Sequence, residues 1–203
     1  LQYASTFGLP VWLRPQDAAL AANGVAHDGE VAARLGLPAI PVFAETAALA
    51  VTLLLARETG ARVHLCRISS AEGVDMVRRA KASGLAVTCD IAIHHAHLSE
   101  MDIGYFDANC RVMPPFRSRR DRDALRQALA DGTIDAVCSD HTPLDDDAKQ
   151  VPFGEAEAVY RSDLGYDGKL SRACIHIDNV WSLHGLHECL TRRGETVERP
   201  LVK

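Results

Sequence analysis

Short apolar runs that alternate with helical patterns restrict the fold of this chain more than any other feature of its sequence. Four segments have the length and composition of buried strands: Leu9–Leu13, Arg62–Ile68, Leu85–Ile93 and Ile134–Cys138. Helical patterns lie between them, over Glu45–Thr59, Ser70–Ser83 and Arg119–Ala130. Strands and helices in this order form parallel sheets with helical crossovers, whose strands read as continuous apolar runs. The sequence therefore predicts an α/β fold, either a doubly wound sheet or a (β/α)-barrel.

The ends of the expected helices carry residues that commonly start or stop a helix. Gly60, Gly84 and Gly132 follow the three helical patterns, and glycine readily adopts the left-handed conformation of a helix C-terminus. Ser69 and Glu72 have the spacing of a capping box, so we expect Ser69 to be the N-cap of the second helix.

Composition and charge exclude several classes of protein. The 203 residues include 22 Lys and Arg against 27 Asp and Glu, a formal net charge of −5, and 47% are hydrophobic. This balance is that of a globular protein without a broad basic face, so we expect no nucleic-acid partner. No apolar run reaches the ~20 residues of a membrane helix, so no membrane partner is expected. Six cysteines without a C-x-x-C pair favour a reducing, cytoplasmic location.

Polar side chains follow each of the four predicted strands. They are Arg14–Asp17, Arg67, His94–His97 and Ser139–Pro143. The carboxyl ends of parallel strands meet at one edge of a sheet, so histidine and carboxylate ligands gathered there suit a divalent metal such as zinc. Each residue also has an ordinary structural interpretation: Asp17 caps a turn, His94 ends a strand in solvent, and Asp140 caps a helix. His64 is interpreted as a core histidine rather than a ligand.

Several linked segments resemble class I dihydroorotases of the amidohydrolase superfamily. They are Asn23–Glu30 running to Pro41, His64–Ser69, Ile93–His95, Pro114–Arg117, and Asp131–Asp135 running into Ser139–His141. The resemblance implies a TIM-type (β/α)8 barrel with zinc at its mouth. It also implies a role in de novo pyrimidine biosynthesis, where the family interconverts carbamoyl aspartate and dihydroorotate.

The resemblance assigns three residual metal positions: Asp17, His94 and Asp140. Asp140 also matches the aspartate that shuttles the proton, so it would be the catalytic residue of an active enzyme. Three functional residues of the family are replaced here, by Arg67, Met113 and Leu144, and its first-strand His-x-His is absent. Arginine is always protonated and has no lone pair, so Arg67 cannot stand in for a neutral imidazole ligand.

These replacements resemble the degenerate, non-catalytic dihydroorotase-like subunits that assemble with aspartate transcarbamoylase. The favoured hypothesis is therefore an inactive assembly subunit, oligomeric and bound to aspartate transcarbamoylase. The alternatives are an active zinc dihydroorotase, which would need zinc as cofactor, and an unrelated soluble α/β domain.

The length of the chain suits part of a barrel. A closed (β/α)8 barrel typically needs ~250 residues, whereas four strands are recognised here. We therefore expect residues 1–158 to be the C-terminal portion of a dihydroorotase-like barrel with its early strands missing. Residues 159–203 no longer follow the family pattern and are interpreted as a divergent tail.

Overall fold

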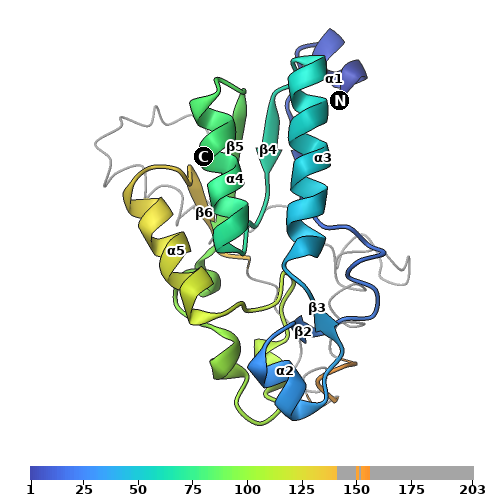
Figure 1. The fold of residues 1–203 in the computed structure, drawn as a ribbon, viewed down its shortest axis with the longest axis vertical. Coiled ribbons are helices and arrows are strands. Elements are labelled where there is room, and N and C mark those ends of the chain that lie inside the picture. The colour runs from blue at the N-terminus through green and yellow to red at the C-terminus, as the bar shows by residue number, and fades with distance from the viewer. Residues whose placement is uncertain (141–149, 151, 156–203) are drawn as a thin grey trace, which may run out of the picture.

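A four-stranded parallel sheet with helices on one face forms the centre of the molecule (Figure 1). The structure, a computed structural model, describes residues 1–140, 150 and 152–155. The strand order is β1-β4-β5-β6, with bounds Val11–Leu13, Val63–Leu65, Val87–Ala92 and Ala136–Cys138. The three long helices are α3 (Phe43–Thr59), α4 (Ala71–Ala82) and α5 (Arg119–Ala130). Helix α4 packs between α3 and α5.

A second, smaller unit lies beyond the N-terminal end of α3 (Figure 1). It contains a parallel pair of two-residue strands, β2 (Ala26–His27) and β3 (Ala39–Ile40), connected by α2 (Glu30–Leu35). The remaining elements are α1 (Gln2–Thr6) and the 3-10 turns η1 (Ile93–Ala96), η2 (Glu100–Ile103) and η3 (Ala108–Cys110). The sequence did not predict β2 and β3, because two residues are too few to show a strand period.

The core lies between the sheet and the three long helices, and it is built from aliphatic side chains. Its fully buried members include Leu49, Leu65, Val77, Ile91, Leu125 and Ile134. Successive strand residues point to opposite faces, so Val63 and Leu65 enter this core while His64 points to the other face. Trp12 pairs with His64 across the sheet and remains 69% exposed. The helix-free face of the sheet therefore carries the polar side chains.

The predicted strand and helix order is confirmed, but each of the four predicted strands is shorter than expected and one helix cap differs. The segment Arg62–Ile68 was expected as one strand, but β4 covers only its centre, Val63–Leu65. Helix α4 is capped by Ser70, whose hydroxyl accepts from the Gly73 amide at 3.0 Å, and not by Ser69 as expected. The reason is tertiary, because Ser69 gives its amide and its hydroxyl to the carboxylate of Glu45.

The buried carboxylate of Glu45 links α3 to the loop between β4 and α4. Glu45 is 3% exposed and accepts from the amide and hydroxyl of Ser69 at 3.0 and 2.5 Å. It accepts from the same groups of Ser70 at 3.1 and 2.5 Å. A side chain at Gly73 would collide with this carboxylate, so glycine is required there. Four donors therefore fix the loop that carries Arg67.

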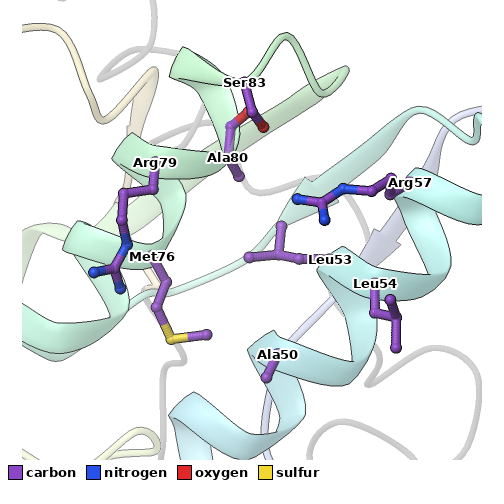
Figure 2. Close-up of a pocket in the computed structure, with 8 residues that line it drawn as sticks. All are labelled: Ala50, Leu53, Leu54, Arg57, Met76, Arg79, Ala80 and Ser83. Carbon is purple, nitrogen blue, oxygen red and sulfur yellow. The ribbon is translucent and has the colours of Figure 1, made fainter.

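A shallow pocket on the helical side lies between α3 and α4 (Figure 2). Apolar side chains of both helices line it, among them Leu53 and Met76, together with Arg57 and Arg79. None of the residues predicted as ligands belongs to this pocket. In the part of the chain that the structure describes, no helix combines the length and the apolar character needed to cross a membrane.

Candidate functional site

Three of the residues singled out from the sequence follow the carboxyl ends of neighbouring strands. Arg67 follows β4, His94 lies in η1 directly after β5, and Asp140 follows β6. Because β4, β5 and β6 are parallel and adjacent, their carboxyl ends meet at one edge of the sheet. The predicted clustering of these three residues is therefore present.

Arg67 and Asp140 form an ion pair at this edge. Nη1 of Arg67 lies 2.7 Å from Oδ1 of Asp140, and the side chains are 20% and 14% exposed. Both residues have left-handed backbone conformations, with φ of 57° and 48°, which cost roughly 1–2 kcal/mol each for non-glycine residues. The amide of Arg67 donates to Oδ1 of Asp90 at 2.6 Å, and this bond helps to hold that conformation.

His94 lies near the ion pair, and the charges of both partners affect the pKa of its ring. Burial lowers the pKa of His94, Asp140 raises it, and Arg67 lowers it, with a net decrease that keeps the ring neutral. Its Nε2 atom is buried and has no hydrogen-bond partner among the described residues. The ring packs against His95 and Phe116, with centroids 4.6 and 5.4 Å away.

Asp17, the third predicted metal ligand, has a capping role. Its Oδ1 accepts from the amides of Ala19 and Leu20 at 2.9 and 3.0 Å, which is the turn-capping role considered for it from the sequence. Met113 is buried, and Leu144 lies outside the described residues, as does the segment 159–203.

The donor set at this edge does not fit the zinc ion that the resemblance implies. The cation next to Asp140 is the guanidinium of Arg67, which has no lone pair to donate. A zinc ion on Asp140 would have to displace that guanidinium and would then lie beside its positive charge. The carboxylate of Asp17 already caps a turn. His94 and Asp140 alone are fewer protein ligands than zinc ordinarily uses.

A different group of ligand-type side chains lies on the helix-free face of the sheet. Within the described residues, His64, Cys66 and Asp90 are the only His, Cys, Asp or Glu residues found as a group, with ligand atoms within 4.8 Å of one another. Nε2 of His64 donates to Oδ2 of Asp90 at 2.9 Å, and Nδ1 lies 2.7 Å from the hydroxyl of Thr88. Burial, followed by the charge of Asp90, raises the pKa of the Cys66 thiol to about 11.

Sequence reasoning did not find this group. His64 was interpreted as a core histidine, and the structure does satisfy both ring nitrogens, but with polar partners on the face opposite the core. The available signal was the spacing of His64 and Cys66, two residues apart along a strand and hence on one face. Asp90 comes from another strand and was hidden inside an apolar run.

His95 is buried as a neutral ring beneath this edge. Its Nε2 donates to the carbonyl oxygens of Pro114 and Pro115 at 3.1 and 3.3 Å. Burial, with a smaller contribution from neighbouring His94, lowers the pKa of His95 to about 3.

We expect the free energy of unfolding to fall as the pH decreases below about 6.5. The unfolded chain then protonates His95, whereas the folded protein does not bind that proton until about pH 3. His27 and His94, whose pKa values are also lowered, act in the same direction. Denaturant unfolding at pH 7.5, 6.0 and 5.0 measures the effect. His95→Gln should flatten the dependence, and His97→Gln, at an exposed position, should leave it unchanged. An equal slope in wild type and His95→Gln would contradict the prediction.

Comparison with known proteins defines the class of this chain. A family model described as dihydro-orotase-like matches residues 5–73. Relatives named dihydroorotase-like protein, from Pseudomonas aeruginosa and Pseudomonas putida, are each 45% identical over 77% of this chain. A protein named dihydroorotase from Pelotomaculum thermopropionicum is 43% identical over 76% of this chain. In each case the match covers 37% of the relative, so the chain spans little more than a third of its relatives' length.

Solved structures agree on the architecture. L-hydantoinase from Arthrobacter aurescens superimposes with a TM-score of 0.64 at 23% identity, over 86% of this chain and 42% of its own. Dihydroorotase from Campylobacter jejuni superimposes with a TM-score of 0.56 at 12% identity, over 98% of this chain and 51% of its own. The parallel sheet and its helices therefore correspond to part of the fold of these proteins, a partial amidohydrolase-type (β/α)8 barrel, as the resemblance implied. Within that class, the chain belongs to the dihydroorotase-like proteins.

Proposed function

We propose that this chain is part of a cytoplasmic, non-catalytic dihydroorotase-like subunit that supports the assembly of aspartate transcarbamoylase. The observation that carries the proposal is the ion pair between Arg67 and Asp140. In an active dihydroorotase, the positions of these two residues belong to ligands of a zinc ion. Here the aspartate is already neutralised by a side chain of the same protein.

The surroundings of the ion pair support an inactive site. The buried side chain of Met113 offers no strong hydrogen bond to a polar, anionic substrate. Oδ1 of Asp140 already accepts a charged hydrogen bond from Nη1 of Arg67 at 2.7 Å. Asp17 is engaged in its own turn. The residues that would bind, orient and deprotonate a substrate are thus replaced or otherwise occupied.

The expected result of a turnover assay is no cyclisation of carbamoyl aspartate, with or without added zinc. The assay uses purified protein that contains this chain, and an active dihydroorotase serves as positive control. Restoring Arg67→His should not produce activity, because Met113 remains. Zinc-dependent turnover by the wild type, lost on His94→Ala, would overturn the proposal.

The assembly role requires a direct interaction with aspartate transcarbamoylase. Size-exclusion chromatography of an equimolar mixture should show one peak that contains both proteins and elutes before either alone. Independent elution of the two proteins from that mixture would contradict the assembly role, whatever the outcome of the turnover assay.

An active zinc dihydroorotase is the second candidate, and one observation favours it. Nε2 of His94 is buried and lacks a partner among the described residues, as a vacant ligand position would. The turnover assay and the His94→Ala variant distinguish this candidate from the non-catalytic subunit.

A further inference from the structure

Three side chains with different metal-binding atoms lie together on the polar face of the sheet. His64 lies in β4, Cys66 follows that strand directly, and Asp90 lies in the adjacent strand β5. The imidazole, thiol and carboxylate atoms lie within 4.8 Å of one another. Nitrogen, sulfur and oxygen are the donors that zinc takes in proteins, at about 2.0 to 2.3 Å from the metal. Ligand atoms around one tetrahedral zinc ion lie about 3 to 4 Å apart, so modest side-chain movement suffices.

Each of the three residues is oriented by a second contact. The hydroxyl of Thr88 lies 2.7 Å from Nδ1 of His64, which leaves Nε2 directed at the cluster. The amide of Arg67 donates to Oδ1 of Asp90 at 2.6 Å, which leaves Oδ2 directed at the cluster. The amide of Cys66 donates to the carbonyl of Leu13 at 2.8 Å and fixes the backbone there. Such outer contacts typically orient the ligands of protein metal sites.

We propose that His64, Cys66 and Asp90 form a binding site for one divalent transition-metal ion of the zinc class. The ion takes the place of the proton between Nε2 of His64 and Oδ2 of Asp90, which are 2.9 Å apart. The imidazole proton moves to Nδ1 and is donated to the hydroxyl of Thr88, while the thiol of Cys66 releases its proton to solvent. No bond other than these and the metal–ligand bonds changes.

Charge and access are compatible with such an ion. A thiolate and a carboxylate together balance a charge of +2, so the loaded cluster is neutral. The side chains of His64 and Asp90 are 12% and 10% exposed, which is partly buried but reachable from the helix-free face. Sγ of Cys138 lies 3.8 Å from Oδ1 of Asp90, outside the proposed ligand set, and is the nearby sulfur that the test has to distinguish from Cys66.

This site uses none of the side chains of the ion pair that carries the proposed function. Its three ligands are not among the residues that the resemblance assigns to the metal of active dihydroorotases. Zinc bound here without turnover leaves the non-catalytic role intact, and an empty site with no turnover does so as well. The two proposals can therefore fail independently.

The test is a titration of chelator-treated, reduced protein containing the whole chain with Co²⁺, followed by competition with Zn²⁺. Wild type should bind one equivalent with a thiolate-to-cobalt charge-transfer band that zinc abolishes. X-ray absorption of the zinc form should show a sulfur at about 2.3 Å. The band should be absent in Cys66→Ala, and His64→Gln should weaken metal binding about tenfold or more. Cys110→Ala is the matched control, because Cys110 lies in the separate apolar cluster around Phe116.

The outcomes separate clearly. Loss of the band in Cys66→Ala but not in Cys110→Ala, with both variants folded by circular dichroism, supports the site. Absence of metal binding by wild type overturns it. A band that survives Cys66→Ala but disappears in Cys138→Ala also overturns it, because the sulfur ligand would then be a different residue.

Discussion

Replacing Glu45 by alanine should lower the free energy of unfolding by about 3–4 kcal/mol. The change leaves the buried amides and hydroxyls of Ser69 and Ser70 without their acceptor. It also removes the negative charge that favours protonated Arg117, which is buried and donates to the hydroxyl of Ser69 at 3.1 Å. Both effects act on the loop that leads from β4 to α4.

Denaturant unfolding and thermal melting measure this loss, with an expected decrease in Tm of about 10 °C for a domain of this size. Glu58→Ala is the matched control, because Glu58 is exposed on the same helix, α3. Its effect should stay within about 0.5 kcal/mol. Glu45→Gln should fall between the two, since its amide keeps one acceptor but presents hydrogens to serine donors. A loss below about 1 kcal/mol in Glu45→Ala would show that the loop is held by other contacts.

Breaking the ion pair between Arg67 and Asp140 should produce the second largest effect. Arg67→Leu leaves the carboxylate of Asp140 largely buried without this cation, and Asp140→Asn leaves the guanidinium without this anion. Because both side chains keep some exposure, we expect less than the 3–5 kcal/mol of a fully buried pair. Each single change should cost about 2 kcal/mol, and the double change Arg67→Leu/Asp140→Asn less than their sum.

A double-mutant cycle isolates the pair from the other contacts of each residue. We expect a coupling energy of about 1–2 kcal/mol, measured by denaturant unfolding at low and high salt. The exposed pair Arg122–Asp123, with Nη2 and Oδ1 2.9 Å apart, is the control and should give under 1 kcal/mol. Asp140→Ala should leave assembly with aspartate transcarbamoylase unchanged if the site has no bound metal on which assembly depends. Zero coupling, or loss of assembly, would show a role for Asp140 other than the one assigned.

The parts of the fold that depend on local sequence patterns could be predicted, and those that depend on contacts between distant residues could not. The strand and helix order was readable because apolar runs and helical periods are local, and Gly60 ends α3 in a left-handed conformation as expected. The cap of α4 was misplaced by one residue because Glu45, distant in sequence, binds Ser69. Strands β2 and β3 are stabilised by pairing with each other and by packing into the apolar cluster around Phe116. Neither is long enough to show an alternating pattern in the sequence.

The candidate site shows the same division. Strand order alone placed Arg67, His94 and Asp140 at one edge, because parallel strands align their carboxyl ends. The residues in the sequence also excluded Arg67 as a metal ligand, since a guanidinium has no lone pair. Whether Asp17 would join the others could not be read from the chain, and in the structure its carboxylate caps a turn.

The order of residues along the chain thus specifies an α/β barrel segment of the dihydroorotase-like kind and an arginine at position 67, which has no lone pair for a metal ion. It does not specify which side chains this arginine contacts. The ion pair joins residues 73 positions apart, and the group of His64, Cys66 and Asp90 joins two strands across 24 or more positions. Such contacts depend on how strands align in the sheet, a property of the packed molecule that no local pattern encodes.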